Sequence, residues 1–600
     1  MSDQPAADPR AEDTIVDLLV VGSGTGMAAA LAAAERGLDV LVVEKTAYVG
    51  GSTARSGGAF WVPDNPVLER EGAQRDPQGA ATYLDALVGD DAAPERRRTY
   101  LQEGPSAVAM LERTTPLRFF WAKGYADYHP EEPGGSAVGR TCEARPFDLR
   151  SLGEDRSRFR PAPLEAPIPM PVTGADYKWF NLMTRVPTKA APRIARRLVE
   201  GLGGLAVGRE YAAGGQALAA GMLAGLRRAG VPVWTRTEVV ELLAGPEADG
   251  SADGAAGADG GSASRVTGAL VEQDGRQVRV TARAGVVLAT GGFDHAVAWR
   301  REHISETLTD DHSLGSEGNL GDGIELGRAL GADTALMDQA WWFPAGAPLP
   351  GGEPQILLAE RSLPGSLIVD QTGDRFIDEA TDYMTFGQRV LELRASHGRA
   401  QEMWLVMDQT YRNSYVLAGV AFPRIPLPAA WLDAGIAVQA DDPRGLARAM
   451  GVPEDGFEQA LSRFNQQAGL GVDSDFGRGN SAYDRYYGDP TVTPNPCLRP
   501  LAGRLYALRM VLSDLGTCGG LVADGQGRVL RADGSVVAGL YAIGNTAANV
   551  FGRCYPGAGA TIGQGLVYGY VIGSRVARRT SSAHTPTTAA AGRQDSASAG

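Results

Sequence analysis

The sequence predicts an α/β fold in which a sheet-based domain is interrupted by an inserted second domain. Residues 14–21 and 39–44 are apolar, β-branched runs typical of buried strands, and the Ala-rich stretch 27–37 between them is typical of a helix. From about residue 340 the chain gains aromatics and prolines and has no glycine-rich loop. After Leu515 the glycine-rich sheet pattern returns, which indicates that the first domain resumes there.

These changes in texture set the expected domain boundaries. Residues 14–339 and 513–578 are expected to form the first domain, and residues 340–512 an inserted α+β domain. Residues 245–265, rich in Gly, Ala, Asp and Ser, are expected to be the disordered tip of a hairpin between strands at 238–243 and 266–271. Residues 1–13 and 580–600 are expected to be disordered tails.

The composition excludes several functional classes. A net charge of −14 over 600 residues argues against a nucleic-acid binder. Four Cys and six scattered His predict neither a disulfide framework nor a metal site. No basic and apolar leader opens the chain, and no apolar run reaches the ~18–20 residues of a spanning helix, so the cytoplasm is the expected location.

The turn after the first strand predicts a dinucleotide site. Gly22-Ser23-Gly24-Thr25-Gly26 joins that strand to the helix, and backbone N–H groups at a helix N-terminus suit a pyrophosphate. Glu44 ends the next strand 22 residues after Gly22, the position of an acid that bonds a ribose hydroxyl. The third glycine departs from the G-x-G-x-x-G pattern, since position 27 is Met. Glycine turns also serve packing alone, and this one does not separate FAD from NAD.

Three later glycine-rich segments favour FAD. Gly50–Gly58 forms a second close-approach loop, Ala289–Gly292 ends a strand, and Gly544-Asn545 precedes a glycine-opened helix suited to a ribityl chain and a flavin edge. Each alone is more often a structural turn, but four in this order indicate a flavin. The predicted FAD-binding residues are Gly22, Ser23, Gly24, Gly26, Glu44, Lys45, Gly51, Ser52, Thr53, Ser56, Gly57, Gly58, Thr290, Gly291, Gly544, Asn545, Gly559, Thr561 and Ile562. No His lies in 50–58 to anchor the flavin, so FAD is expected to be non-covalent.

The same segments resemble the flavoprotein family of fumarate reductases and 3-ketosteroid dehydrogenases, and most closely its 3-ketosteroid Δ1-dehydrogenases. The most telling piece is Arg553-Cys-Tyr-Pro-Gly-Ala-Gly-Ala-Thr-Ile-Gly563. The other matching stretches are 20–45, 50–63, 127–130 with 134–140, 319–323, 338–342, 373–387, 513–520 and 539–569. The resemblance implies a Rossmann-like FAD-binding domain with an inserted α+β substrate (cap) domain, acting on steroids.

The resemblance also implies roles for four residues. The hydroxyl of Tyr555 and the N–H of Gly559 would hold the 3-keto oxygen, Tyr383 would take the C2 proton, and Tyr128 would hydrogen-bond that base. The C1 hydrogen would leave as hydride to the flavin. The chemistry is sound, because donors at the keto oxygen stabilise a developing enolate. A tyrosine, with an ordinary pKa of about 10, needs help from its surroundings to act as a base.

The chain departs from the family pattern in two further places, and three different functions stay open. Ala558 stands where the family often has Pro, and residues 245–265 are an insertion; neither touches the three tyrosines. A fumarate-reductase-like enzyme would need a basic cluster for a dicarboxylate. The inserted domain instead offers aromatics, and its Arg361 and Arg375 have a structural interpretation. The second open function is a 3-ketosteroid Δ4-dehydrogenase, and the third is a non-catalytic flavin-binding protein.

The expected partners are a steroid substrate and an external, quinone- or dye-like electron acceptor. Residues 184–207 also predict a basic amphipathic helix, in which Lys189, Arg193, Arg196 and Arg197 accompany apolar residues. The simpler interpretation is a solvated helix packed on its own domain. The competing hypothesis is a peripheral contact with the inner face of the membrane, where a lipophilic substrate concentrates.

Overall fold

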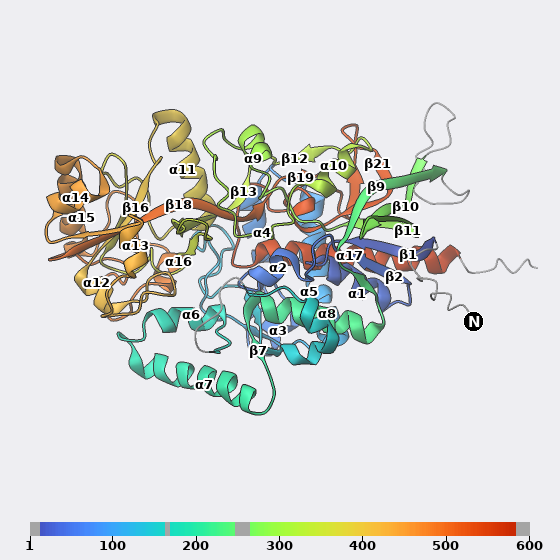
Figure 1. Cartoon of the computed structure of the whole chain (residues 1–600), viewed down its shortest axis with the longest axis horizontal. Helices are drawn as coiled ribbons and strands as arrows, with labels where there is room; N and C mark the ends of the chain where they lie inside the picture. Colours follow the sequence, from blue (N-terminus) through green and yellow to red (C-terminus); the bar gives the residue numbers. More distant parts are fainter. Residues whose placement is uncertain (1–12, 163–168, 247–263, 584–600) are drawn as a thin grey trace, which may run out of the picture.

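The chain folds around two β-sheets that lie side by side (Figure 1). The computed structural model describes residues 13–162, 169–246 and 264–583, and within these ranges one sheet has eight strands and the other six. The predicted tail 1–13 lies outside the described residues except for its last residue. The two sheets and the helices that cover them confirm the predicted fold class.

The first sheet has the order β20-β21-β11-β1-β2-β8, with the β9–β10 hairpin attached to β11. Strands β1, β2, β8, β11 and β21 are parallel where they pair. Along β1, Leu18 and Val20 point to one hydrophobic core and Leu19 and Val21 to the other, so this strand is buried on both faces. The strands are β1 (Thr14–Val21), β2 (Val40–Val43), β8 (Val233–Trp234), β9 (Thr237–Pro246), β10 (Ser264–Gln273), β11 (Arg276–Leu288), β20 (Arg528–Leu530) and β21 (Val536–Ala542).

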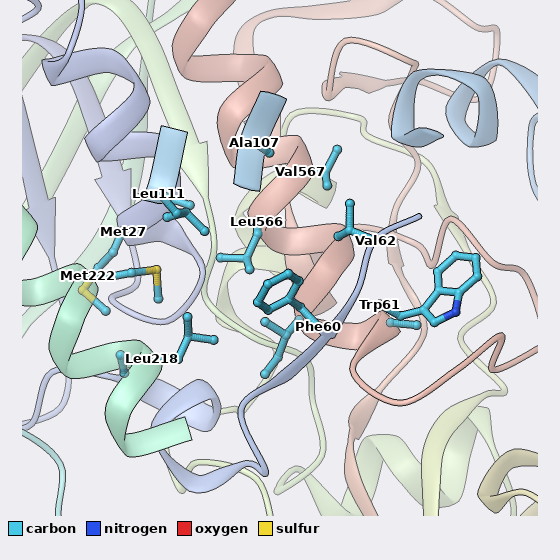
Figure 2. Packing of buried hydrophobic residues seen from close by; sticks show 14 of the residues in the cluster. Met27, Phe60, Trp61, Val62, Ala107, Leu111, Leu218, Met222, Leu566 and Val567 are labelled. Carbon is cyan, nitrogen blue, oxygen red and sulfur yellow. The ribbon is translucent and has the colours of Figure 1, made fainter. Parts of the chain in front are cut away.

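Four helices and a short strand pack on one face of this sheet. Figure 2 shows side chains from α1 (Gly26–Ala34), α5 (Pro94–Thr114), α8 (Gly214–Ala229), α17 (Ala560–Ala583) and β3 (Ala59–Trp61) in one cluster. Small residues let α1 and α17 approach closely, since a Cβ on Gly573 would lie 2.6 Å from the Ala29 carbonyl oxygen. This tight layer holds the N-terminus of α1 and the start of α17 in fixed positions.

Two segments predicted to be disordered begin or end in regular structure. Strands β9 and β10 pair as predicted, but β9 continues to Pro246 and β10 starts at Ser264, so the ladder extends into the 245–265 segment. The rest of that segment lies outside the described residues. Helix α17 continues to Ala583, three residues beyond the predicted start of the tail, because it packs along α1; residues 584–600 lie outside the description.

The second sheet has the order β14-β13-β18-β16-β15, and β17 also pairs with β18. On β16, Met403, Leu405 and Met407 face one core while Trp404 and Val406 face another, so this sheet too is covered on both sides. The predicted boundary at 512 falls inside β18. This strand continues to Thr517 because its residues from Met510 to Thr517 pair with β13. The strands are β13 (Ala340–Gly346), β14 (Gln355–Ile356), β15 (Ser366–Asp370), β16 (Met403–Asp408), β17 (Ala437–Ala440) and β18 (Leu505–Thr517).

A segment from the first part of the chain also packs against the second sheet. Helix α6 (Gly174–Asn181) and the turn after it bring Leu182 into the core around β16. The Arg185 Nε atom lies 2.7 Å from Asp489 Oδ2, and Thr184 Oγ1 donates to the Ser414 carbonyl oxygen. Helix α7 (Pro187–Ala206) follows and forms the lower edge of the molecule in Figure 1, within the predicted 184–207 helix.

Shorter elements complete the fold. Within the described residues, no helix is long and apolar enough to cross a bilayer. The remaining elements are α2 (Gly51–Arg55), α3 (Pro66–Arg70), α4 (Pro77–Val88), β4 (Phe119–Trp121), β5 (Thr141–Ala144), β6 (Phe147–Asp148), η1 (Leu149–Arg158), β7 (Tyr211–Ala212), α9 (Val297–His303), α10 (Asp322–Arg328), β12 (Thr334–Ala335), α11 (Tyr383–His397), α12 (Gln409–Ser414), α13 (Ala429–Asp433), α14 (Pro443–Met450), α15 (Glu454–Leu470), α16 (Ala482–Tyr486), β19 (Gly520–Leu521) and η2 (Gly544–Thr546).

Candidate active site

A cavity of about 870 Å³ runs from the carboxyl ends of β1 and β11 to the face of the second sheet. The carboxyl edge of an open parallel sheet is where nucleotides usually bind. All the predicted site residues except Gly26 line this cavity. The structure therefore brings together five segments that lie far apart in the sequence.

The first turn offers an open helix N-terminus to the cavity. Gly22 has φ +104°, and a Cβ there would lie 2.2 Å from the Ala289 carbonyl oxygen, so only glycine fits. The N-cap of α1, Thr25, makes no side-chain capping bond. The first N–H groups of α1 are therefore free of a side-chain cap and suit a phosphate.

Gly26 does not reach the cavity. A Cβ at this position would lie 3.0 Å from both the Ala289 Cβ and the Val20 Cγ1 atoms. Gly26 therefore lets α1 pack closely on the sheet, which is a different task from the predicted contact with the cofactor. Close packing of the helix on the strand is the usual role of the third glycine in such a turn.

The acid at the end of β2 is buried and well bonded. Glu44 Oε2 accepts hydrogen bonds from the N–H and the hydroxyl of Ser23, and Oε1 accepts from the N–H and hydroxyl of Thr46. Glu44 lines the cavity, so its carboxylate is the group that would accept a hydrogen bond from a ribose hydroxyl. Lys45, beside it, is ion-paired with Asp322.

The predicted loop at 50–58 contains a short helix instead. Helix α2 (Gly51–Arg55) forms because Gly50 and Gly51, with φ of +126° and +49°, turn the chain sharply into it. Ser52 Oγ accepts from the Ser316 N–H and the Asn319 Nδ2 atom, each at 2.9 Å. The helix thus ties the glycine turn to residues 316–319, a link that the sequence analysis missed.

The other two glycine segments meet across the sheet edge. The hydroxyls of Thr290 and Thr546 lie 3.1 Å apart, and Thr546 Oγ1 also donates to the Gly291 carbonyl oxygen. Asn545 Oδ1 accepts from Trp341 Nε1 at 3.0 Å. The Asn545 side chain therefore connects the first domain to β13 at the junction of the two sheets.

This part of the cavity fits a flavin dinucleotide. A Cβ on Gly57 would meet nothing within 4 Å, and a Cβ on Gly24 would meet only Thr53 Oγ1, at 3.3 Å, and the Gly50 carbonyl oxygen, at 3.9 Å. Backbone atoms thus line the wall where a pyrophosphate would approach, beside an uncapped helix N-terminus. The segments from Gly22 to Gly58, Thr290–Gly291, Gly544–Asn545 and Gly559–Ile562 are those that would hold FAD.

Beyond the glycine-lined part, the three predicted tyrosines form one cluster. The ring centroid of Tyr128 lies 5.6 Å from that of Tyr383 and 5.0 Å from that of Tyr555, and the Tyr383 and Tyr555 rings are 6.5 Å apart. Tyr383 begins α11, and the side chain of the N-cap residue Asp382 accepts hydrogen bonds from the N–H groups of Met384 and Thr385. The Tyr128 N–H donates to the Pro556 carbonyl oxygen, which fixes the loop of Tyr128 against the loop of Tyr555.

Burial raises the pKa of each of these phenols. For Tyr555 the rise is opposed by hydrogen bonds to the hydroxyl of Thr561 and the N–H of Gly559. For Tyr383 the strongest opposing influence is the positive charge of Arg361. The Tyr383 hydroxyl is buried and, within the described residues, has no hydrogen-bond partner. It is therefore available to a ligand.

Four further tyrosines extend this cluster. Tyr125 stacks on Tyr486 and lies 5.6 Å from Tyr487, and Tyr483 lies 4.6 Å from Tyr128. Tyr125 and Tyr487 line the cavity. Sequence reasoning missed them; the density of aromatics at 483–487 was the available signal, but it does not reveal which residues that segment meets.

The far wall of the cavity is mostly apolar, although Thr173, Tyr177 and Asn181 from the same segments also line the cavity. It is formed by side chains from the segment before α6, from α6 and α7, and from the loop after α12. No Arg or His contributes to this wall in the described part of the chain. The residues are Met170, Val172, Phe180, Met183, Ile194, Leu198, Val416, Ala418, Val420 and Phe422.

The fold and this cavity define a flavoprotein with a FAD binding domain, the description of the family that matches residues 17–562. The chain belongs to this family and, within it, to the 3-oxosteroid 1-dehydrogenases. It is 41% identical over 569 residues to the 3-oxosteroid 1-dehydrogenase of Mycobacterium tuberculosis (strain ATCC 25618 / H37Rv), covering 94% of this chain and 98% of the relative.

Two other similarities describe the neighbourhood of the family. The structure of 3-ketosteroid delta1-dehydrogenase from Sterolibacterium denitrificans, in complex with 1,4-androstadiene-3,17-dione, matches with a TM-score of 0.86 and 34% identity, over 94% of this chain and all of the other. The 4-oxocyclohex-2-ene-1-carboxylate 5-dehydrogenase of Sinomonas cyclohexanicum is 34% identical, covering 94% of each chain.

Proposed function

We propose that this protein is a FAD-dependent dehydrogenase that introduces the C1=C2 double bond into the A ring of 3-ketosteroids, as part of steroid degradation. The observation that carries the proposal is the convergence of Tyr128, Tyr383 and Tyr555 between a glycine-lined cofactor wall and a long apolar wall. Membership of the family supports the same reaction.

The tyrosines and one backbone amide divide the work. The Tyr555 hydroxyl and the Gly559 N–H would donate to the 3-keto oxygen, which acidifies the C2–H bond by stabilising the enolate. Tyr383 would accept the C2 proton, and Tyr128 would orient Tyr383 by ring contact and hydrogen bonding. When bound, FAD supplies the two-electron oxidant that takes the C1 hydride. We propose that it is non-covalent, since no His lies at 50–58.

The apolar wall distinguishes a steroid from smaller, charged substrates. A dicarboxylate or a carboxylated cyclohexanone needs a cationic partner, and the far wall offers none in the described residues. A rigid fused-ring hydrocarbon buries its whole length against such a wall. With Tyr383 and Tyr555 in these proposed roles, the reaction would occur at the carbons beside the keto group.

The test is a substrate panel with one acceptor. The purified protein is incubated with a 3-keto-4-ene steroid, a saturated 3-ketosteroid or 4-oxocyclohexanecarboxylate, together with a redox dye that stands for the proposed external, quinone-like acceptor. With the 3-keto-4-ene steroid we expect loss of flavin absorbance when the dye is left out, and a product two mass units lighter when the dye, which reoxidises the flavin, is present. No bleaching with any ketone would indicate a non-catalytic flavin protein, and turnover of the carboxylate alone would indicate the wrong substrate class.

We also propose that residues 340–512 act as the substrate domain inserted between residues 14–339 and 513–578. This domain supplies Tyr383 at the start of α11 and Phe343 from β13, and the two rings are 4.9 Å apart. The first domain supplies Tyr128, Tyr555 and Gly559. The reaction would thus take place at the junction of the two sheets.

A contact with a lipid surface is proposed at the mouth of the cavity. Helix α7 turns Ile194 and Leu198 into the cavity and leaves Val199 and Leu202 71% and 51% exposed. Phe422, which also lines the cavity, is 41% exposed. The exposed apolar side chains therefore continue directly into the substrate wall, as expected for an enzyme that takes a lipophilic substrate from a membrane.

The four basic residues of this helix contribute less free positive charge than the sequence indicated, because each contacts another side chain of the protein. Arg197 is paired with Asp176 and Glu200, and Arg196 with Glu200. Lys189 and Arg193 lie over the ring of Trp179, at 5.3 and 4.8 Å. The apolar side chains, more than net charge, would therefore carry the binding.

We predict that the protein pellets with liposomes and that the double substitution Val199→Glu, Leu202→Glu abolishes this. Burying two carboxylates at a lipid surface is unfavourable, whereas both positions are exposed and tolerate charge in water. The measurement is co-sedimentation with vesicles of neutral and of anionic lipid. Leu470→Glu, at a 76% exposed position on α15 that does not line the cavity, is the matched control. Absence of pelleting by the parent protein at low salt would contradict the proposal.

A further inference from the structure

A buried arginine lies against the proposed base. Arg361 is 1% exposed, and its Cζ atom is 5.3 Å from the ring centroid of Tyr383. Its Nη1 atom donates to the carbonyl oxygens of Glu379 and Thr381, at 2.6 and 2.9 Å. The guanidinium is therefore fixed by the backbone of the segment that leads into α11, which also carries Tyr383.

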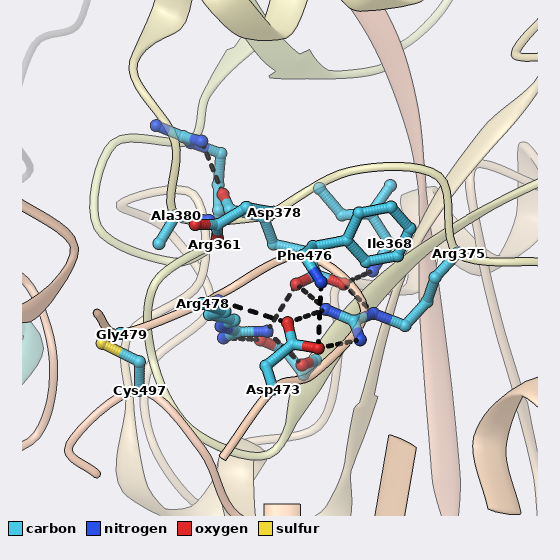
Figure 3. A network of polar contacts seen from close by, with 12 residues as sticks. Arg361, Ile368, Arg375, Asp378, Ala380, Asp473, Phe476, Arg478, Gly479 and Cys497 are labelled. Atoms are coloured by element: carbon cyan, nitrogen blue, oxygen red, sulfur yellow. Dashed lines mark hydrogen bonds and ion pairs between the residues drawn. The ribbon is translucent and has the colours of Figure 1, made fainter. Parts of the chain in front are cut away.

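Arg361 has no carboxylate partner. No Asp or Glu in the described part of the chain forms an ion pair with it, and its Nε atom is unbonded. The carboxylate of Glu379 is occupied by Arg375 and Arg478, and Asp473 also pairs with Arg375. Figure 3 shows this network of two arginines and two acids below Arg361. Arg361 contacts the network through its hydrogen bond to the Glu379 carbonyl oxygen. The network is balanced without Arg361.

The two acids nearest in sequence to Arg361 and Tyr383 form hydrogen bonds with other groups. Asp382 caps α11 through the N–H groups of Met384 and Thr385, and its other oxygen lies 3.7 Å from His129 Nε2. Glu360 accepts from the hydroxyl of Tyr177 and the N–H of Ala418. Burial raises the pKa of Glu360 to about 7. Arg361 thus brings a positive charge to an interior site where no carboxylate of the described residues forms an ion pair with it.

A buried and unpaired charge destabilises a folded protein. The charge is compensated if a nearby group becomes negative during the reaction, and Tyr383, whose ring centroid lies 5.3 Å from the Arg361 Cζ atom, carries such a group in its phenol. Building on the proposed function, we propose that Arg361 is a positioning residue whose guanidinium stabilises the deprotonated form of Tyr383, making this tyrosine the base.

Two observations support this assignment. Burial raises the pKa of the Tyr383 phenol, and Arg361 is the strongest influence that lowers it. The other groups that face the phenol are hydroxyls, of which those of Tyr125 and Tyr483 lower its pKa less than Arg361 does, and one acid, Glu360, which raises it. They are Tyr125 and Tyr128 from the segment after β4, Tyr483 and Tyr487 from α16 and its end, Tyr555 from the loop before α17, and Glu360 beside Arg361.

The test compares Arg361→Met with Arg361→Lys. The Met variant keeps an apolar stem and removes the charge, whereas the Lys variant keeps the charge. Single-turnover flavin reduction by steroid is measured as a function of pH. We expect the rate of the Met variant to rise with pH at least about one pH unit later than that of the parent protein. At pH values below this rise, the variant should react at least about tenfold more slowly. At the alkaline end its rate should approach that of the parent, and the Lys profile should stay close to the parent profile.

Arg394→Met is the matched control. Arg394 lies near the end of α11, the helix that Tyr383 begins, and, like Arg361, it donates to a backbone carbonyl, that of Ala400. Its removal should leave the pH profile unchanged. A rate loss in Arg361→Met that is equal at every pH, or an equal loss in both Arg361 variants, would overturn the proposal and indicate a structural role.

A second measurement does not depend on turnover. The tyrosinate absorbance of the protein and of its Tyr383→Phe variant is titrated with pH, and the difference reports Tyr383 alone. The same difference is measured in the Arg361→Met background, where we expect a higher midpoint. An unchanged midpoint would contradict the role of Arg361. If no steroid reduces the flavin, the proposed function fails, but this titration still decides the effect of the arginine on the phenol.

Discussion

Replacing Tyr383 with Phe is expected to slow flavin reduction by about 10²–10⁴-fold, the usual contribution of a positioned general base. The substitution keeps the ring and its contacts with Tyr128 and Phe343, and removes a hydroxyl that has no partner within the described residues. Flavin content and thermal stability should therefore match those of the parent. The measurement is single-turnover reduction of the bound flavin by a 3-keto-4-ene steroid.

Tyr555→Phe is the comparison variant for this result. It should weaken steroid binding more than Tyr383→Phe does, because it removes a donor to the keto oxygen, while the Gly559 N–H preserves part of the enolate stabilisation. A spectral titration with steroid separates the two effects. Reduction at nearly the parent rate by Tyr383→Phe would refute its role as base, and Tyr128 would become the candidate.

Gly24→Val is expected to abolish flavin loading. Within the protein a Cβ at this position would meet only Thr53 Oγ1, at 3.3 Å, and the Gly50 carbonyl, at 3.9 Å, so the chain should still fold. The side chain would occupy the space through which a pyrophosphate approaches the N-terminus of α1. The measurement is the flavin absorbance of the purified protein. Flavin freed by denaturing the parent protein checks the non-covalent attachment.

Gly22→Val cannot replace Gly24→Val in that experiment, because it is expected to disturb folding as well. Comparing the two variants therefore separates loss of folding from loss of flavin binding. A Cβ on Gly22 would collide with the Ala289 carbonyl at 2.2 Å, in a backbone conformation that valine avoids. This variant should lose both folding and flavin, whereas Gly24→Val should lose flavin alone. Normal loading of Gly24→Val would mean that the phosphate lies elsewhere.

The sequence predicts those parts of the site that depend on a short, continuous segment of the chain. A strand, a glycine turn and a helix in succession specify the end of β1 and the start of α1, and the prediction of the fold class is confirmed. The predicted site residues, with the exception of Gly26, lie along one cavity. Gly26 shows the limit of this approach, because a glycine needed for close packing and one needed for a ligand look the same in one dimension.

The rest of the site depends on contacts between distant segments. Tyr125, Tyr483 and Tyr487 surround the predicted tyrosines only because α16 meets the segment after β4. The unpaired state of Arg361 depends on how Arg375 and Arg478 divide Glu379 and Asp473. Helix α2 replaced a predicted loop, since two glycines with positive φ turned the chain into a helical start. None of these arrangements follows from local pattern or propensity.

The position of residues 174–186 has a consequence for exchanging parts between relatives. This segment precedes the second sheet by more than 150 residues in the chain, yet Leu182 completes the core of that sheet and Arg185 neutralises its buried Asp489. A chimera that grafts only residues 340–512 from a relative would bring a foreign surface to both contacts. Transplanting substrate preference as a stable module therefore requires moving two discontinuous pieces together, and a library that recombines at a single crossover would mostly yield mismatched halves.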